Sequence, residues 1–292
     1  MDSLLTLEYK STISTFNLHH YNNEKLELFA KRDDLIHTEV SGNKLRKLKF
    51  QLKKYFEFNC EVIQTYGGAY SNHLLATASA CQFLGIPCVG VVRGEELNNE
   101  SNSILKRCTQ LGMQLVFMNR SQFQQEKHRE EMIEKNGKLT LIIPEGGFSY
   151  LGVKGCEEII PNEPVFDLYV VAFGTGTTAA GILNSLPRNA KLLVVPVLKG
   201  YDVKAAIQSL IPECYPEKER QLIIDFDAHF GGYAKSNEEL LLFIRDFNAK
   251  NEMQIEPVYT GKAMWSLNKL LQERKDLDIK KVLFVHTGGL YK

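Results

Sequence analysis

Short runs rich in β-branched residues alternate with helix-forming segments from about residue 61 onward, and this alternation limits the fold more than any other feature of the chain. Glycine, proline, asparagine and serine residues join the segments. Such an order is typical of βαβ units, in which a helix connects two parallel strands. The sequence therefore predicts an α/β protein.

Two series of expected strands are separated by the proline-containing stretch at 161–164. Each series is long enough for its own sheet, so we expect two open, twisted parallel sheets with flanking helices. The segment 26–31 alternates apolar and charged residues and could add a strand to either sheet. The expected strands are 62–66, 88–92, 114–117, 139–143, 168–173, 192–197, 222–226 and 282–286, and helices are expected to begin near Ser71, Asn99 and Ser121 and to span 237–248 and 261–273.

The charge and the cysteines narrow the class of protein. Lysine and arginine together number 35, as do aspartate and glutamate, so no net field favours nucleic acid or an anionic membrane. No run approaches the roughly 18 apolar residues of a spanning helix, and the first ten residues lack a signal-peptide pattern. The six cysteines form no C-x-x-C pair. We expect a cytoplasmic protein without a bound metal, since the histidines also lack metal-ligand spacing.

A lysine stands at the start of an expected helix. Asn43 is a suitable N-cap, and apolar residues follow at helical spacing, which places Lys44 in the first turn. The helix start and the neighbouring Arg46 and Lys47 disfavour the ammonium form of Lys44 and favour a nucleophilic amine, as Schiff-base lysines require. The alternative is that these cations form only the solvated face of an amphipathic helix.

Two glycine-containing turns precede expected helices. The segment 67–73 ends a strand with Gly-Gly and leads into Ser71, Asn72 and His73, an arrangement that suits a carboxylate or phosphate or is an ordinary βα turn with Ser71 as N-cap. The segment 174–181 follows a strand with Gly-Thr-Gly-Thr-Thr and predicts a phosphate cradle. It lacks the lysine of a Walker A loop and the acidic residue of a dinucleotide site, which favours a monophosphate ligand.

Six segments in this order resemble a known family. The set is similar to the pyridoxal-phosphate enzymes of the 1-aminocyclopropane-1-carboxylate deaminase and D-cysteine desulfhydrase family, which have the tryptophan-synthase-β-like fold (fold type II). The resemblance covers nearly the whole chain. The segments are Lys-Arg-Asp-Asp-Leu at 31–35, Gly-Asn-Lys-x-Arg-Lys-Leu at 42–48, Gly-Gly-x-x-Ser-Asn-His at 67–73, Gly-Thr-Gly-Thr-Thr-x-x-Gly at 174–181, Pro-Val-Tyr-Thr-Gly-Lys at 257–262 and His-Thr-Gly-Gly at 286–289.

The resemblance implies roles for residues at the matching positions. Lys44 would hold pyridoxal 5'-phosphate covalently and, once released, act as the base for the substrate's α-proton. Asn72 would bind the cofactor's ring oxygen, and Ser71 with the adjoining Asn72 and His73 would bind the substrate carboxylate. Tyr259 and Tyr233 would lie near the substrate. The phosphate would be held by Gly174, Thr175, Gly176, Thr177 and Thr178.

One position separates the two activities of this family. In the cyclopropane deaminases, the residue after the Pro-Val-Tyr tyrosine is a glutamate that pairs with the pyridine nitrogen, whereas this chain has Thr260, with Thr287 as another candidate hydroxyl. A hydroxyl makes the ring a weaker electron sink, and β-elimination demands less of that sink. The resemblance therefore implies a desulfhydrase-like elimination from a small amino acid such as D-cysteine, giving pyruvate, ammonia and sulfide.

Two alternatives remain at this point. One is 1-aminocyclopropane-1-carboxylate deaminase activity, and the other is a non-catalytic protein that binds a nucleotide phosphate at 174–181. The resemblance also implies a homodimer and two domains. We expect a larger cofactor-binding domain from residues 1–55 and 146–292, and a smaller α/β domain from residues 56–145.

Overall fold

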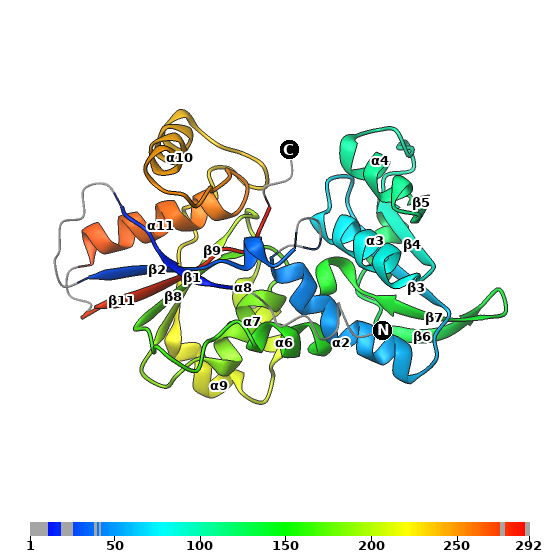
Figure 1. Ribbon diagram of the computed structural model, residues 1–292, viewed down its shortest axis with the longest axis horizontal. Helices are drawn as coiled ribbons and strands as arrows, with labels where there is room; N and C mark the ends of the chain where they lie inside the picture. The colour runs from blue at the N-terminus through cyan, green and yellow to red at the C-terminus, as the bar shows by residue number, and fades with distance from the viewer. Residues whose placement is uncertain (1–10, 19–25, 38–39, 41, 275–277, 290–292) are drawn as a thin grey trace. The chain divides into compact units, whose positions relative to one another are not determined.

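The computed structural model describes residues 11–18, 26–37, 40, 42–274 and 278–289. Its contacts divide the chain into two compact units, and Figure 1 labels their elements. The first unit contains His37–Gly155, and the second contains Ser11–Ile36 and Cys156–Lys292. The sequence predicted that residues 37–55 belong to the larger domain. They group with the first unit instead, because the helix that they contain packs against another helix of the first unit.

The first unit is built on a five-stranded sheet with the order β5-β4-β3-β7-β6. The first four strands of this order run parallel, and only the edge strand β6 is antiparallel. The strands are β3 (Val62–Gly67), β4 (Cys88–Arg93), β5 (Gln114–Met118), β6 (Glu131–Lys135) and β7 (Lys138–Ile143), and the helices are α2 (Asn43–Glu57), α3 (Asn72–Leu84), α4 (Ser103–Gln110), α5 (Arg120–Glu126), the 3-10 turn η2 (Glu145–Gly147) and α6 (Tyr150–Glu157).

The second unit is built on a six-stranded sheet with the order β1-β2-β11-β8-β9-β10, which is parallel except at its edge strand β1. Its strands are β1 (Ile13–Thr15), β2 (Glu27–Lys31), β8 (Leu168–Phe173), β9 (Lys191–Pro196), β10 (Leu222–Ile224) and β11 (Lys281–Val285), and its helical segments are η1 (Asp33–Leu35), α7 (Thr177–Ser185), α8 (Val203–Leu210), α9 (Tyr215–Lys218), η3 (Glu219–Gln221), α10 (Glu238–Lys250) and α11 (Thr260–Glu273).

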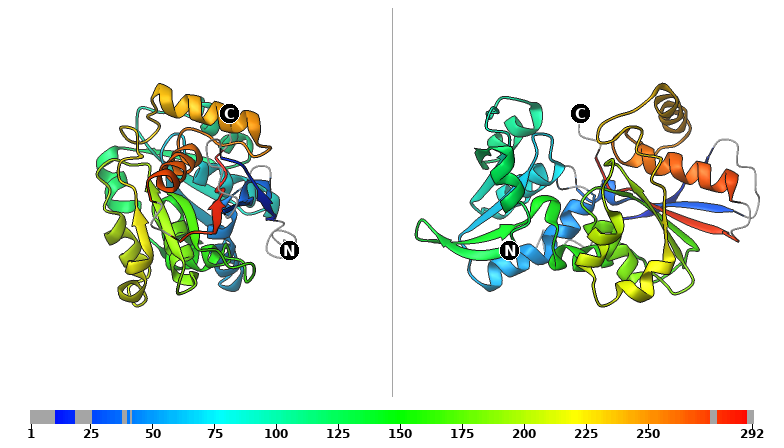
Figure 2. Two further views of the ribbon diagram at one scale, coloured as in Figure 1. Left: turned by 90° about the vertical axis from the view of Figure 1, so that its left-hand side faces the viewer. Right: turned by 180° about the vertical axis from the view of Figure 1, so that it is seen from behind.

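Helices cover both faces of the six-stranded sheet, as Figures 1 and 2 show. Both α7 and α11 contact the central strands β8 and β9. Every residue of β8 is buried, as expected for a parallel strand covered on both sides. The strands β8 and β11 are parallel neighbours, so their C-terminal ends lie side by side. Loops that follow these two strands therefore start close together, where ligands of α/β proteins usually bind.

The predicted α/β class with two sheets is confirmed, and the differences are local. The segment expected at 26–31 joins the six-stranded sheet through β11. The helix expected near Asn99 begins at Ser103, because the side chain of Asn102 caps it. The strand expected at 222–226 ends at Ile224, since the Asp225 carboxylate accepts hydrogen bonds from the next backbone N–H groups and turns the chain.

Two edge strands were not expected from the sequence. One is β1, and the other is β6, which forms a hairpin with β7. Asn136 and Gly137 connect the hairpin with φ angles of 53° and 70°. Positive φ at both central residues is the geometry of a type I′ turn, for which Asn-Gly is a favoured sequence. This dipeptide was therefore a usable signal for β6.

Candidate active site

The helix α2 presents Lys44 in its first turn. The expectation that Asn43 is the N-cap is wrong, because the helix begins at Asn43 and its N-cap is Gly42, whose φ of 66° suits glycine. Asn43 instead accepts a hydrogen bond on Oδ1 from the Nζ atom of Lys44 at 2.6 Å. The side chain of Lys44 is thus oriented by its neighbour in the same helical turn.

The first turn of α2 is not a solvated basic face. Arg46 and Lys47 have exposed fractions of 1% and 4%. The Nζ atom of Lys47 donates to the carbonyl oxygen of Gly146 at 3.0 Å. Cations are rarely buried unless partnered, so this cluster has a purpose beyond solubility. The burial favours the functional interpretation of the segment over the alternative of a surface face.

The turn before α3 holds Ser71 close to the strand that precedes it. Ser71 is the N-cap, and its Oγ atom accepts a hydrogen bond from the backbone N–H of Leu74 at 3.2 Å. A Cβ atom on Gly67 would lie 2.6 Å from that Oγ atom, so this turn requires a glycine. Because the Ser71 oxygen is the acceptor in the cap, its proton can still be donated to a ligand. The cap interpretation and the ligand interpretation are therefore compatible.

The loop from Gly174 to Thr178 joins β8 to α7. Gly176 is the N-cap with a φ of 104°, and no side chain caps the first turn of the helix. A Cβ atom on Gly176 would lie 3.1 Å from the ring of Phe173, so a side chain would crowd this loop. An uncapped helix start with glycines and two threonine hydroxyls is a donor set that suits a phosphate group.

The threonine in the Pro-Val-Tyr-Thr segment is bound to a carboxylate in the same turn. Thr260 is fully buried, and its hydroxyl donates to Oε1 of Glu256 at 3.2 Å while accepting the Glu256 backbone N–H at 3.0 Å. The carboxylate also accepts the backbone N–H groups of Val258, Tyr259 and Thr260 at 2.6 to 2.8 Å. Because the proton of Thr260 is used by Glu256, its oxygen can offer only a lone pair to another group.

Two tyrosines lie together beside the glycine loop. The rings of Tyr233 and Tyr259 meet edge to face with centroids 6.0 Å apart. A Cβ atom on Gly174 would lie 3.4 Å from the ring of Tyr259. Tyr233 is the more exposed of the two, at 43%. The structure therefore brings together the candidate residues of three separate segments of the second unit.

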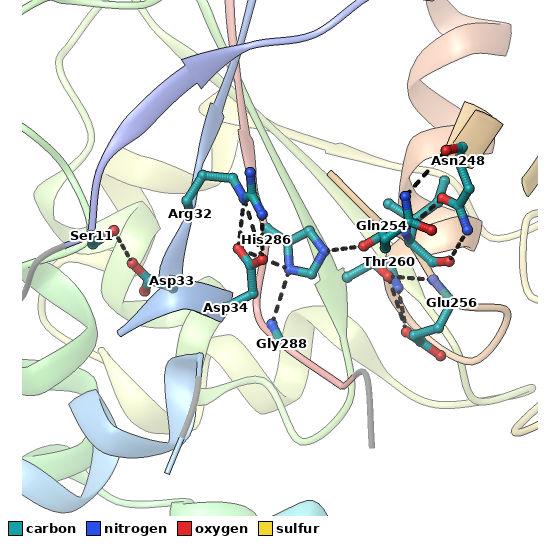
Figure 3. Close-up of polar contacts among 11 residues, drawn as sticks. Ser11, Arg32, Asp33, Asp34, Asn248, Gln254, Glu256, Thr260, His286 and Gly288 are labelled. Carbon is teal, nitrogen blue, oxygen red and sulfur yellow. Dashed lines mark hydrogen bonds and ion pairs between the residues drawn. The ribbon is translucent and has the colours of Figure 1, made fainter. Parts of the chain in front are cut away.

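His286 connects the last of the six segments to the first, as Figure 3 shows. Its Nε2 atom lies 2.7 Å from the carbonyl oxygen of Gln254, and its Nδ1 atom accepts the backbone N–H of Gly288 at 3.3 Å and lies 3.5 Å from Asp34. Arg32 binds the Asp34 carboxylate with two nitrogens. This buried network fixes the backbone on both sides of Thr287.

Thr287 is the other candidate hydroxyl for the pyridine nitrogen. It follows β11, and its exposed fraction is 8%. Its side chain has no hydrogen-bond partner among the residues that the structure describes. Thr287 can therefore donate a proton to a ligand, whereas Thr260 cannot without releasing Glu256.

Sequence reasoning missed Glu256, Asp34 and His286 as supporting residues because nothing in the spacing indicates which side chains meet.

A buried lysine holds the loop that carries Tyr233. The Nζ atom of Lys262 in α11 donates to the carbonyl oxygens of His229 and Gly232, both at 2.8 Å. Lys262 is fully buried, and burial lowers its pKa to about 8, while the charge of Glu256 acts in the opposite direction. The lysine of the Pro-Val-Tyr-Thr-Gly-Lys segment is thus a structural anchor for the loop at 229–233.

We expect Lys262 to make the stability of the protein depend on pH. Between pH values of about 8 and 10.5, the unfolded chain holds a proton on Lys262 that the folded chain has released. The free energy of unfolding therefore rises with pH in this range. The full rise is on the order of 3 kcal/mol for a pKa that falls from 10.5 to about 8. Urea unfolding at several pH values should show a shallower rise in Lys262→Met. Equal slopes in both proteins would contradict this assignment.

A family model described as pyridoxal-phosphate dependent enzyme matches residues 12–288. The chain belongs to this family. It is therefore a pyridoxal-phosphate enzyme, and the open alternative of a non-catalytic nucleotide-binding protein is not supported.

Relatives and a solved structure define the similarity further. The chain is 31% identical over 292 residues to a bifunctional D-cysteine desulfhydrase/1-aminocyclopropane-1-carboxylate deaminase of Arabidopsis thaliana, covering 90% of this chain and 72% of that protein. It is 29% identical over 288 residues to a D-cysteine desulfhydrase of Klebsiella pneumoniae, covering 90% and 87%. The crystal structure of an ACC deaminase homologue matches with a TM-score of 0.78 and 26% identity, covering 99% and 94%.

The residues present fit the cofactor. The uncapped start of α7 after Gly176 suits its phosphate, and the uncommitted hydroxyl of Thr287 suits its ring nitrogen. The candidate residues fall into two sets, one in each unit. Lys44, Ser71, Asn72 and His73 belong to the first unit, and Gly174–Thr178, Tyr233, Tyr259, Thr260 and Thr287 belong to the second.

Proposed function

We propose that this enzyme catalyses α,β-elimination from a small amino acid, most specifically D-cysteine, giving pyruvate, ammonia and sulfide. The observation that carries the proposal is the side chain at position 260. A threonine stands there, and its proton is donated to Glu256. With its proton committed to Glu256, Thr260 cannot donate to the cofactor's ring nitrogen, so that nitrogen would accept a hydrogen bond from Thr287 and stay unprotonated, which suits a reaction whose leaving group carries charge away.

The cofactor, when bound, supplies an electron-withdrawing ring that acidifies the α-carbon of the substrate. Lys44 would hold it covalently and, when released, take the α-proton on Nζ. Asn72 would orient the ring by binding its oxygen. The hydroxyl of Ser71, together with the N–H groups at the start of α3, would bind the substrate carboxylate.

We place the phosphate at the loop from Gly174 to Thr178 and the substrate beside Tyr259 and Tyr233. We propose a homodimer in the cytoplasm. The free state of all six cysteines supports a reducing compartment. Among the described residues, no helix is long and apolar enough to cross a membrane.

A substrate panel tests the proposed reaction. The purified protein, loaded with pyridoxal phosphate, should release pyruvate and sulfide from D-cysteine and much less 2-oxobutyrate from 1-aminocyclopropane-1-carboxylate. The variant Thr260→Glu, which places a carboxylate at this position, should shift the ratio of the two activities toward ring opening. Cofactor-loaded protein that opens the cyclopropane ring but forms no pyruvate from D-cysteine would overturn the choice of reaction.

A further inference from the structure

The loop between β10 and α10 has a strained backbone. The residues Phe230, Gly231, Gly232 and Ala234 have positive φ angles of 52°, 94°, 123° and 54°. Phe230 and Ala234 carry a Cβ atom, which makes this left-handed conformation unfavourable. Such a conformation persists only where the surrounding structure holds it, and it is common at functional sites. Tyr233 lies within this strained segment.

Side chains from the first half of α11 hold this loop. The Oγ atom of Ser266 donates to Oδ2 of Asp225 at 2.6 Å, at the start of the loop. The ring of Trp265 meets the ring of Phe230 edge to face, with centroids 5.8 Å apart. Lys262 donates two hydrogen bonds to backbone carbonyls of the loop. One helix therefore fixes the loop at several points.

The contact from Lys262 to Gly232 acts on the backbone directly before Tyr233. The carbonyl of Gly232 belongs to the peptide group that joins Gly232 to Tyr233, and a peptide group is planar. The hydrogen bond of 2.8 Å to this oxygen therefore fixes the plane from which Tyr233 continues. The second hydrogen bond, to the carbonyl oxygen of His229, holds the other end of the same turn.

The burial of Lys262 favours a role in orienting the loop over a role in stability alone. Lys262 is fully buried, and removing a charged group from water is costly. An apolar side chain of similar length would fill the same space without that cost, but it could not donate to the two carbonyl oxygens. The ammonium group therefore serves the geometry of the turn.

We propose that Lys262 is a positioning residue, which orients the peptide group before Tyr233 and so holds the Tyr233 ring against Tyr259 on the substrate side of the site. The two rings meet with centroids 6.0 Å apart. This inference rests on the proposed function, in which both tyrosines lie beside the substrate. A ring that is already in place loses little freedom when the substrate binds, so Lys262 favours substrate binding more than the chemical step.

Lys262→Met tests this role, and Lys269→Met is its control. Methionine has a side chain of similar length that donates no hydrogen bond, and Lys269 is exposed on the same helix. In the cofactor-loaded enzyme, we expect Lys262→Met to raise the KM for D-cysteine about tenfold and to keep kcat within about threefold. Lys269→Met should match the wild type in both. An unchanged KM in folded Lys262→Met would overturn the proposal, because a role in stability alone predicts that result.

A double-mutant comparison shows whether Lys262 acts through Tyr233. In a Tyr233→Ala background, the further change Lys262→Met should alter KM by less than about twofold, since the side chain that Lys262 positions has been removed. A rise of about tenfold in both backgrounds would contradict the proposal.

Hydrogen exchange followed by mass spectrometry measures the loop without any substrate. The backbone N–H groups of Gly232 and Lys235 donate to the carbonyl oxygens of His229 and Gly232 at 3.0 and 3.1 Å. These amides should be protected in the wild-type enzyme and in Lys269→Met, and they should exchange about tenfold faster in Lys262→Met. Equal exchange of the peptide 229–235 in Lys262→Met and the wild type would overturn the proposal.

The wild-type exchange also covers the case in which Lys262→Met fails to fold. An unprotected peptide 229–235 in the wild-type enzyme would show that the loop is not held and would overturn the proposal. If the wild-type enzyme forms no pyruvate from D-cysteine, the proposed function fails, while the exchange rates still decide whether Lys262 holds the loop.

Discussion

Gly155→Ala should strongly destabilise the protein. A Cβ atom at Gly155 in α6 would lie 1.8 Å from the backbone carbonyl oxygen of Arg46 in α2 and 2.6 Å from its carbonyl carbon. Both partners are backbone, so the two helices must move apart. We expect a loss of about 3 kcal/mol or more in the free energy of unfolding, measured by urea denaturation.

Gly68→Ala is the matched control for this change. Gly68 belongs to the same unit, and the nearest atom to its added Cβ would be a guanidinium nitrogen of Arg93 at 3.6 Å, an ordinary contact. Its effect should stay within about 1 kcal/mol. Because α2 also carries Lys44, Gly155→Ala should lower the cofactor content of the purified protein as well. Equal stabilities of the two variants would contradict the packing of α6 against α2.

Lys44→Ala should abolish turnover while leaving the fold intact. The variant loses both the amine that would hold the cofactor and the base that would take the α-proton, so the rate should fall about a thousandfold or more. The side chain is only half-buried, and the stability of the folded chain should change little. Initial rates of pyruvate formation from D-cysteine and thermal unfolding curves provide the two measurements.

Lys53→Ala is the matched control on the same helix. Lys53 is exposed, and its ammonium group lies 5.0 Å from the ring centroid of Phe50. Its removal should leave the rate and the bound cofactor unchanged. If Lys44→Ala retained wild-type turnover, or if Lys53→Ala lost it, the assignment of Lys44 would be wrong.

Much of the fold could be predicted because the central strands are buried on both faces. The residues of β8, for example, form a continuous apolar run bounded by a turn signal, and the expected range 168–173 is the observed one. Edge strands give weaker signals. Most residues of β6 are partly exposed or charged, so the run at 131–135 does not read as a core strand, and only Asn136-Gly137 marks the hairpin.

The parts of the candidate site that one short stretch of sequence forms could be predicted. A glycine-rich turn after a buried strand identifies the loop at 174–178 without any long-range contact. The residues that hold such loops in place come from distant parts of the chain, so their contacts depend on tertiary packing. Asp34 and His286 are 252 positions apart in the chain and meet at 3.5 Å, and no periodicity in a single sequence contains that pairing.

The proton of Thr260 shows what the sequence could not decide. A threonine in place of a glutamate was visible, but the direction of its hydrogen bond was not. The structure places Glu256 in the turn before α11, where four hydrogen bonds stabilise its carboxylate and make Thr260 a donor to it. The local error at Asn43 has a similar origin, since Gly42 adopts a positive φ and allows the helix to begin one residue earlier.

The most direct test of the central claim is to find the residue that carries the cofactor. The protein is loaded with pyridoxal phosphate, reduced with borohydride to trap the bond between the amine and the cofactor's aldehyde, digested, and mapped by mass spectrometry. We expect a single modified peptide with the cofactor on Lys44. A colourless protein that cannot be loaded, or a stoichiometric adduct on another lysine, would contradict the account.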